Sequence, residues 1–270
     1  MLKINSLSKT FHANTANEVR ALQNVSLILE KGSFTAIIGT NGSGKSTLLN
    51  SVAGTFVPDM GSIHLENHNI TYWPEYKRAS LIGRVFQNPF AGTVADMTIA
   101  ENIVIAMKRG QHRSLRLAVT RAFRDDVADR IRTLKMGLED RLDNPIGTLS
   151  GGQRQALTLL MAAWTRPKIL LLDEHTAALD PKSAAKVAEL TKIIIEREKL
   201  TALMVTHSMQ QAVDLPDRII MMHRGKIVED YQHEQKRRAR VPDLMSTFDR
   251  VQKRELFDES VAGMLQTQYL

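Results

Sequence analysis

The sequence predicts an α/β fold built around a mainly parallel β-sheet, and three observations predict it. Short apolar strands alternate with helical patterns, most clearly after residue 168. The segments 169–172 and 202–205 are apolar without interruption, which is typical of strands covered on both faces. A glycine-rich turn at residues 39–44 joins an apolar strand to a helical pattern. This order of elements favours a parallel sheet with helices on both of its faces.

The first 38 residues are predicted to form strands, and the chain then continues with short elements. Residues 25–30 partly alternate apolar and polar side chains, and residues 34–38 form a short apolar run before the glycine-rich turn. We expect a helix at residues 45–53 and further strands at residues 62–65 and 82–86.

A helical insert is predicted between about residues 89 and 163, where the strand pattern disappears. We therefore expect a helical subdomain there, with its last helix at about residues 154–163. Its apolar residues recur at helical spacing: Ile99, Ile103 and Met107, then Val127, Ile131 and Leu134. The alternation resumes with a strand at residues 169–173, a helix at 181–198 whose first turn suits Pro181, and strands at 202–205 and 218–222.

We divide the chain into a domain at residues 1–230 and a tail at residues 231–270 that we expect to be helical. The tail is more polar, and Pro242 and Asp243 suit the first turn of a final helix. A basic run at residues 236–240 could contact anionic lipid or a partner protein, or could be the solvated face of a helix.

The composition is ordinary for a globular chain and excludes several kinds of chemistry. The formal charge of +7 permits an acidic partner such as a nucleotide, and it also suits an ordinary solvated surface. No cysteine is present, which excludes disulfide scaffolds, thiol catalysis, thiolate zinc sites and iron–sulfur clusters. Apolar runs stay far below the length of about 18 residues that a membrane helix needs. The first residues, MLKINSLSKTF, lack the apolar core of a secretory signal.

A phosphate-binding loop is predicted at residues 39–47, which read GTNGSGKST and match the pattern G-x-x-x-x-G-K-[ST]. Glycines let N–H groups turn toward phosphate oxygens, and the helix that follows presents its positive end to the same anion. Lys45 would lie along the β- and γ-phosphates, and Ser46 would ligate Mg²⁺. The predicted nucleotide ligands are Gly39, Thr40, Asn41, Gly42, Ser43, Gly44, Lys45, Ser46 and Thr47.

Two adjacent carboxylates, Asp173 and Glu174, follow the apolar run ILLL. Asp173 could hold Mg²⁺, and Glu174 could orient and partly deprotonate an attacking water. Phosphoryl transfer depends mainly on positioning and charge neutralisation, so a cation, a lysine and one base suffice. Strands also run into acidic loops without any catalytic role, and the phosphate-binding loop is what favours the catalytic interpretation.

A second glycine cluster, Ser150, Gly151, Gly152 and Gln153, precedes another predicted helix and suits a second anion site. One nucleotide does not need two such sites. The economical hypothesis is that two chains share each nucleotide, with the second cluster facing the γ-phosphate held by Lys45 of the other chain. An ordinary capped helix start is the alternative.

Taken together, these residues resemble the ATP-binding cassette (ABC) ATPase family over residues 2–230. GTNGSGKST resembles its Walker A motif, LSGGQRQAL its signature motif and ILLLDE its Walker B motif. Gln87 in VFQNP resembles the Q-loop glutamine, Asp180 in ALD the D-loop and His207 in MVTH the switch histidine. The resemblance implies a P-loop NTPase core, an N-terminal antiparallel β subdomain and a helical subdomain that carries the signature.

The resemblance also implies roles for single residues, with ATP and Mg²⁺ bound. Phe11 would stack on adenine with Val19 beneath it, and core packing is the alternative for Phe11. Gln87 would reach Mg²⁺ or the lytic water, and a surface glutamine is the alternative. His207 would contact the γ-phosphate, and a structural histidine is the alternative. Asp180 would communicate across a dimer, and it could at the same time be the N-cap of the helix opened by Pro181. The implied catalytic residues are Glu174, His207 and Gln87, and the implied metal ligands are Ser46, Gln87 and Asp173.

The sequence departs from the family at two positions beside the acidic pair. The family commonly has proline where this chain has His175 and serine where it has Ala177. His175 is titratable and could tune turnover with pH, but we expect it to be a solvent-facing loop residue. The spelling DEHTAALD resembles bacterial uptake ATPases that work with a separate permease and an extracytoplasmic solute-binding protein.

We therefore expect an ATP-hydrolysing subunit that powers solute import at the cytoplasmic face of the cell membrane. Two copies would sandwich the nucleotides, and the insert near residues 87–107 would grip a cytoplasmic loop of the permease. One alternative is an exporter ATPase. Another is a non-transport relative that acts on nucleic acid or ribosomes, but such proteins usually carry a coiled-coil or zinc insert, or two cassettes. Residues 45–149 contain neither insert and the chain has one cassette, so no nucleic-acid partner is expected.

Overall fold

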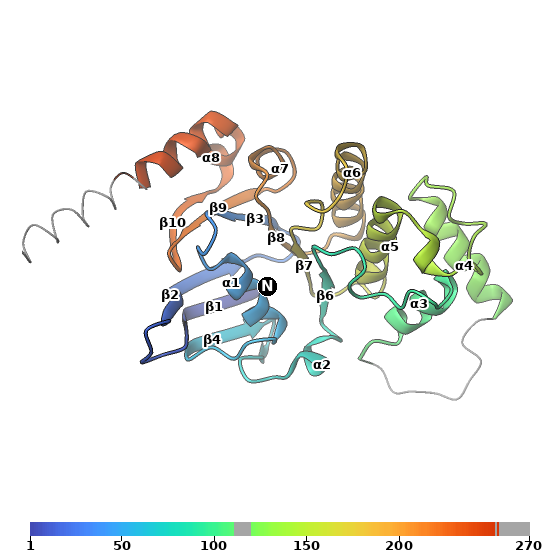
Figure 1. The fold of residues 1–270 in the computed structure, drawn as a ribbon, viewed down its shortest axis with the longest axis horizontal. Helices are drawn as coiled ribbons and strands as arrows, with labels where there is room; N and C mark the ends of the chain where they lie inside the picture. Colours follow the sequence, from blue (N-terminus) through green and yellow to red (C-terminus); the bar gives the residue numbers. More distant parts are fainter. Residues whose placement is uncertain (111–119, 252, 254–270) are drawn as a thin grey trace, which may run out of the picture.

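The computed structural model describes residues 1–110, 120–251 and 253, and it has an α/β fold with two sheets (Figure 1). The central sheet has six strands, and every neighbouring pair is parallel except β9 and β10. In spatial order these strands are β10 (Lys226–Tyr231), β9 (Arg218–His223), β3 (Phe34–Gly39), β8 (Ala202–Val205), β7 (Ile169–Asp173) and β6 (Ile82–Val85).

An antiparallel sheet lies beside the central one, at the lower left of Figure 1. Its strands, in spatial order, are β2 (Val19–Leu29), β1 (Leu2–Phe11), β4 (Met60–Leu65) and β5 (His68–Asn69). Strands β1 and β2 are long and are joined by an exposed turn at residues 12–18. The expected strands within the first 38 residues are therefore confirmed, and they run further than the alternation in residues 25–30 suggested.

Two apolar clusters cover the two faces of the central sheet, which explains why β8 and residues 169–172 of β7 are apolar without interruption. In β7, Leu170 and Leu172 join the cluster that contains α5 (Gly151–Ala163) and α6 (Pro181–Glu198). Residues Ile169 and Leu171 point the other way, to the cluster that contains α1 (Lys45–Ala53) and the antiparallel sheet. Helix α1 is therefore held between the two sheets.

The described chain between β6 and β7 is mainly helical, as the sequence predicts. It contains α3 (Ile99–Met107), α4 (Arg121–Arg132), the short 3₁₀ helix η1 (Ile146–Thr148) and α5. The expected start of the last helix at Arg154 is wrong, because Ser150 caps the helix and the first turn begins at Gly151. The strand expected at residues 82–86 ends one residue earlier, and α2 (Glu75–Arg78) precedes it.

The described part of the C-terminal tail packs against the domain. In the tail, α8 (His233–Arg238) follows β10, and residues 241–251 are also helical; α7 (Met209–Asp214) lies in the domain, before β9. Leu244 and Phe248 of that last helix are buried in the main apolar cluster. Lys236 donates to the Val213 carbonyl at 2.7 Å, so it is not a purely solvated charge. Residues 254–270 of the predicted tail lie outside the described residues.

Candidate functional site

The glycine-rich loop connects the carboxyl end of β3 to the first residue of α1. Gly44 is the N-cap of α1, with a φ of 96°, and a Cβ there would lie 2.2 Å from the Ala21 carbonyl oxygen. A Cβ on Gly39 would lie 2.3 Å from the Met222 carbonyl oxygen. Glycine is therefore required at both positions, and α1 begins without a capping side chain.

Lys45 is buried and is held inside this loop. Its Nζ donates to the carbonyls of Gly39 and Thr40, each at 2.9 Å. Burial lowers the pKa of the Lys45 ammonium, and the Glu174 carboxylate partly offsets that effect. The loop thus places one cation beside the helix end, which is the charge arrangement that a phosphate chain requires.

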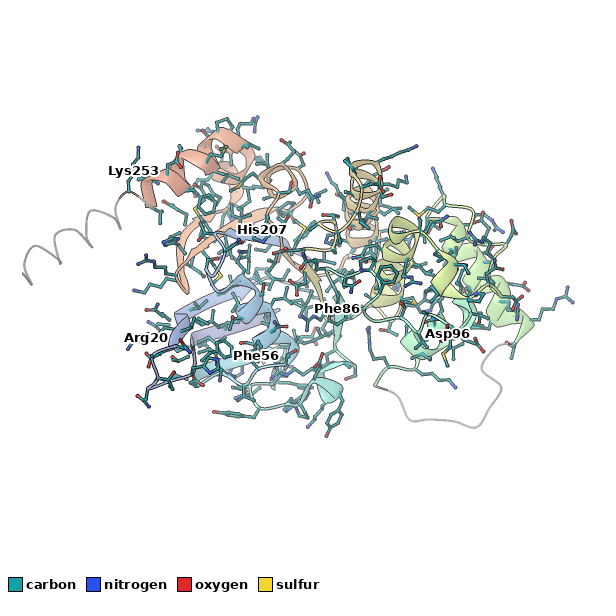
Figure 2. The ribbon with its side chains drawn as sticks, in the orientation of Figure 1. Arg20, Phe56, Phe86, Asp96, His207 and Lys253 are labelled. Carbon is teal, nitrogen blue, oxygen red and sulfur yellow. The ribbon has the colours of Figure 1, made fainter. Side chains whose placement is uncertain are left out.

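The two carboxylates lie at the end of β7, next to the end of β8. Asp173 forms an ion pair with Arg84 of β6, with 3.3 Å between Oδ2 and the guanidinium nitrogen. The Glu174 amide donates to the Val205 carbonyl at 2.9 Å, and its carboxylate lies 2.5 Å from His207 Nε2. The structure therefore brings Glu174 and His207 together, although 33 sequence positions separate them; Figure 2 labels His207 near the centre of the view.

Gln87 is exposed and follows the end of β6. Its strand neighbours β7, because Val85 pairs with Leu172 in parallel register. The carboxyl ends of β6, β7, β8 and β3 thus lie along one edge of the sheet and carry Gln87, Asp173, His207 and the phosphate-binding loop, respectively. Ligand sites of open parallel sheets form at this edge.

The signature turn is a capped helix start. The Gln153 amide donates to Ser150 Oγ at 3.3 Å, and the Ser150 amide donates to Gln153 Oε1 at 3.2 Å. A Cβ on Gly152 would lie 2.6 Å from Ser183 Oγ, so Gly152 lets α5 pack closely on α6. In Figure 1, α5 and α1 lie apart within one chain, with β6 and β7 between them.

Asp180 begins α6, as its place before Pro181 suggests. Its carboxylate accepts from the Ser183 amide at 3.1 Å. Hydrogen bonds from the Ser183 side chain and backbone lower the pKa of the Asp180 carboxyl. The predicted N-cap interaction is therefore present at this residue.

Phe11 and Val19 lie opposite each other at the turn between β1 and β2. The Phe11 ring contacts Phe56 edge to face, with 5.2 Å between ring centroids, and Val19 is 52% exposed. Phe11 is therefore partly packed, and Val19 presents apolar surface to solvent.

The expectation that His175 faces solvent is wrong. Its side chain is 1% exposed and its Nε2 lies 2.9 Å from Thr191 Oγ1 on α6. Burial lowers the pKa of the His175 imidazole to about 4, so the ring is neutral near pH 7. The polar sequence of this loop does not indicate that His175 is buried, because the burial depends on the packing of α6 next to β7.

Two further residues near the carboxylates were not found from the sequence. Arg84 holds Asp173 and also donates to Asn50 Oδ1 of α1 at 2.6 Å. Gln155, which is fully buried on α5, donates to the carbonyls of Phe86 and His175. Both contacts join segments that are distant in sequence, and no local motif indicates them.

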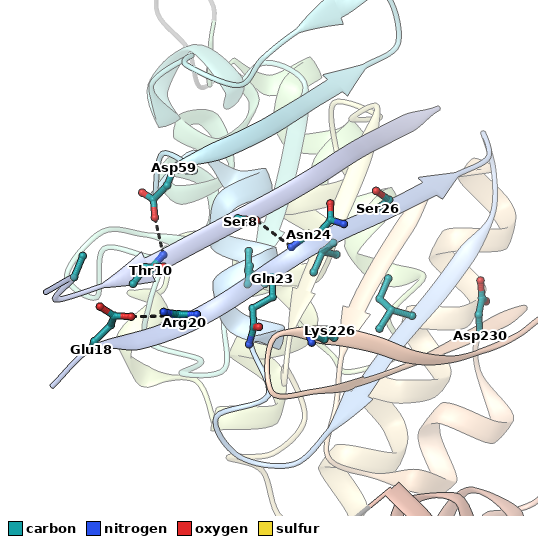
Figure 3. A pocket seen from close by; sticks show the side chains of 14 residues that line it. Ser8, Thr10, Glu18, Arg20, Gln23, Asn24, Ser26, Asp59, Lys226 and Asp230 are labelled. Atoms are coloured by element: carbon teal, nitrogen blue, oxygen red, sulfur yellow. Dashed lines mark hydrogen bonds and ion pairs between the residues drawn. The ribbon is translucent and has the colours of Figure 1, made fainter. Parts of the chain in front are cut away.

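A separate open cleft of about 1060 Å³ lies over β1, β2 and β10 (Figure 3). Its polar groups largely satisfy one another: the Thr10 amide donates to Asp59 at 2.6 Å, and Arg20 pairs with Glu18 at 3.0 Å. We assign the candidate site to the sheet edge because the titratable groups converge there.

The donor set at this edge suits a hard divalent cation. Asp173 offers a carboxylate and Ser46 a hydroxyl, and Mg²⁺ sites in nucleotide-binding proteins combine one or two protein oxygens with phosphate oxygens and waters. Among the described residues there is no cluster of three or more His, Cys, Asp or Glu that would hold a metal by itself. In that same part of the chain, none of the helices combines the length and the apolar character needed to span a membrane.

Comparison with known proteins shows extensive similarity. A sequence model described as ABC transporter matches residues 22–177. The tyrosine transport ATP-binding protein of Clostridioides difficile (strain R20291) is 40% identical over 92% of this chain and 99% of its own length. The methionine import ATP-binding protein MetN 1 of Bacillus thuringiensis subsp. konkukian (strain 97-27) is 32% identical over 85% of this chain and 66% of its own length.

Solved structures agree with these relatives. A dimeric structure of the ATP-binding cassette MJ0796 in a post-hydrolysis state, bound to ADP and Pi, superposes with a TM-score of 0.73 at 27% identity. The match covers 86% of this chain and 98% of that one. The fold, the phosphate-binding loop and these matches agree, and the chain belongs to the ABC transporter family as an ATP-binding subunit that hydrolyses ATP.

Proposed function

We propose that this subunit powers the import of a solute through a membrane permease, at the cytoplasmic face of the cell membrane. The observation that carries the enzymatic part is the pairing of Glu174 with His207 at the sheet edge that also holds the Lys45 loop. Support for import comes from the relative named for methionine import, and the relative named for tyrosine transport supports a transport role. Export remains the alternative direction.

In this proposal the loop at residues 39–47 binds the phosphates, and Lys45 contacts the β- and γ-phosphates. Glu174 accepts a proton from the attacking water, and His207 orients Glu174 and contacts the γ-phosphate. Ser46 and Asp173 would hold Mg²⁺, with Gln87 as a further ligand. When bound, Mg²⁺ neutralises charge on the phosphate oxygens. Phe11 and Val19 would hold the adenine, consistent with the exposed apolar surface at that turn.

We propose further that two copies form a closed pair around two nucleotides. Helix α5, which starts with the signature residues Ser150, Gly151, Gly152 and Gln153, lies apart from α1 within one chain (Figure 1), so a second copy would bring these residues to the γ-phosphate. Asp180, exposed at the start of α6, would lie near the contact between the copies. The dimeric MJ0796 cassette supports this arrangement. Because ATP and ADP would bind the closed pair differently, hydrolysis would reopen it.

The permease is proposed to dock in a groove of about 1110 Å³ between α2, β6 and α3. Exposed apolar side chains line it, among them Tyr76, Val94 and Ile105. Arg84, which pairs with Asp173, also lines the groove, so a docked segment would lie next to the candidate metal ligand. A solute-binding protein would act through the permease and would not touch this chain.

The catalytic assignment is tested by Glu174→Gln. We expect hydrolysis to fall by at least about 10²-fold, because base catalysis is lost, while ATP binding persists. The matched control is Glu189→Gln, a surface glutamate on α6 that pairs with Lys186. Steady-state hydrolysis and binding of a fluorescent ATP analogue are measured for both. Unchanged turnover in Glu174→Gln would remove the assignment.

The transport part needs a separate experiment. We expect the subunit, purified gently from membranes, to bring with it a permease, and the ligand of the associated solute-binding protein would identify the solute. Recovery with an export permease, or with ribosomes, would replace import by one of the alternative functions.

A further inference from the structure

Gln155 connects α5, the helix that starts with the signature residues and is called here the signature helix, to two loops of the candidate site. Its side chain is fully buried, and its Nε2 donates to the carbonyls of Phe86 and His175, each at 2.8 Å. Phe86 precedes Gln87, and His175 follows Glu174. Among the described residues, Gln155 Oε1 has no hydrogen-bond partner, so the amide is oriented by what its nitrogen donates to.

The loop after β7 needs such support because Glu174 has an unfavourable backbone conformation. Its φ is 45°, in the left-handed region that residues with a side chain rarely adopt. The Glu174 amide donates to Val205, and the Glu174 carbonyl accepts from the Ala177 amide, each at 2.9 Å. A strained residue keeps its conformation only when its surroundings determine it from several sides.

His175 supplies the next points of attachment. Thr191 Oγ1 donates to the Val187 carbonyl at 2.8 Å, so it accepts a hydrogen bond from Nε2–H of the neutral His175 ring. The ring is thereby tied to α6, while the His175 carbonyl is tied to α5 through Gln155. The peptide after Glu174 is therefore held between two helices.

We propose that Gln155 is a positioning residue for ATP hydrolysis, which holds the Glu174 and Gln87 loops in a fixed relation to the signature helix. Gln155 lies two residues beyond Gln153 on the same continuous helix. A displacement of the signature turn therefore moves the group that holds both loops. This inference rests on the proposed roles of Glu174 and the signature turn.

The first test replaces Gln155 by methionine, which keeps the length of the side chain and removes both donors. Misplacement of the loops should lower kcat by about 10- to 100-fold. The ATP dissociation constant should stay within about twofold of the native value, because Gln155 does not contribute to ATP binding in the ground state. The matched control is Leu157→Met on the same helix, a buried apolar exchange of similar volume. An unchanged kcat in Gln155→Met, or an equal loss of ATP binding, would overturn the proposal.

The second test is Gln155→Glu, measured as a pH profile against the native protein. The protonated carboxyl can donate one hydrogen bond to a carbonyl, and the ionised form can donate none. Relative to the native protein, turnover of this variant should therefore rise as pH falls. A profile parallel to the native one would show that donation to these carbonyls does not set the rate.

The third test combines Gln155→Met with Glu174→Gln in single-turnover hydrolysis. If Gln155 acts through Glu174, adding Gln155→Met to Glu174→Gln lowers the hydrolysis rate little beyond the loss that Glu174→Gln causes alone. Losses that multiply would show an independent structural effect and would contradict the proposal. If Glu174→Gln alone leaves turnover unchanged, the proposed function fails at Glu174, whatever Gln155 does.

Discussion

The starts of α1 and α5 are both glycine-rich, and they differ in how their amide groups are used. The N-cap of α1 is Gly44, which lies in the left-handed region and supplies no capping side chain. The N-cap of α5 is Ser150, which is extended and forms a complete capping box with Gln153. The first helix start thus leaves its amides for a ligand, and the second is already partly satisfied by its own chain.

The glycines of the two turns also differ in what surrounds them. Gly39 and Gly44 are pressed against backbone carbonyls, and Gly152 against Ser183 of α6. Gly151 is different, since a Cβ there would meet Leu179 only at an ordinary 3.4 Å. The fold of one chain therefore explains the glycines of the phosphate-binding loop and Gly152, and it does not explain Gly151. A second molecule that approaches the signature turn would explain why glycine stands at position 151.

The largest expected effect is that of Gly44→Ala. The positive φ and the clash with the Ala21 carbonyl should destabilise the fold by about 3 kcal/mol or more and abolish ATP binding. Gly137→Ala is the control, because Gly137 has a φ of 64° and a Cβ there would meet no atom within 4 Å. It should cost about 1 kcal/mol and leave ATP binding intact. Urea unfolding and ATP-analogue binding decide the outcome, and equal losses in both variants would contradict the steric argument.

An intermediate effect is expected when alanine is placed at the two signature glycines in turn. Gly152→Ala should cost about 1–3 kcal/mol of stability through overpacking against Ser183. Gly151→Ala should change stability by less than about 0.5 kcal/mol. It should still lower hydrolysis by at least about tenfold, if a partner's γ-phosphate approaches that turn. Thermal unfolding and turnover are measured for each, and full activity in Gly151→Ala would argue against the paired arrangement.

The smallest effect separates capping from nucleotide contact at Ser150. Ser150→Ala and Thr98→Ala each break a capping box, one at α5 and one at α3, and each should cost about 1 kcal/mol. Only Ser150→Ala should also reduce hydrolysis beyond the effect of lost stability. Similar turnover in the two variants would show that Ser150 only caps α5 and does not contact the nucleotide.

Local sequence signals predict much of the fold. The helices at Lys45–Ala53 and Pro181–Glu198 and the strand at Ala202–Val205 have the predicted bounds, because a glycine turn, an Asp-Pro start and an uninterrupted apolar run mark them. The start of α5 was placed too late, although Ser150 and Gln153 have the spacing of a capping box.

The contacts that complete the site were not predictable in this way. Arg84 meets Asp173, and Gln155 meets His175, only after the sheet and α5 have been assembled. His175 was misplaced for the same reason, since its burial depends on Thr191 in a helix that comes later in the chain. Motifs identify the candidate nucleotide-binding residues, and long-range packing decides which residues hold them in place.

The central place of β3 has a consequence for how the protein is made. Both neighbours of β3 come from the last third of the chain, and the Ser43 carbonyl accepts from the Gly225 amide at 3.0 Å. On the ribosome, the phosphate loop therefore emerges long before the strands that hold it. Nascent chains that stop before Gly225 lack β10 and the Gly225 amide, so they cannot complete this sheet or its contact with the loop.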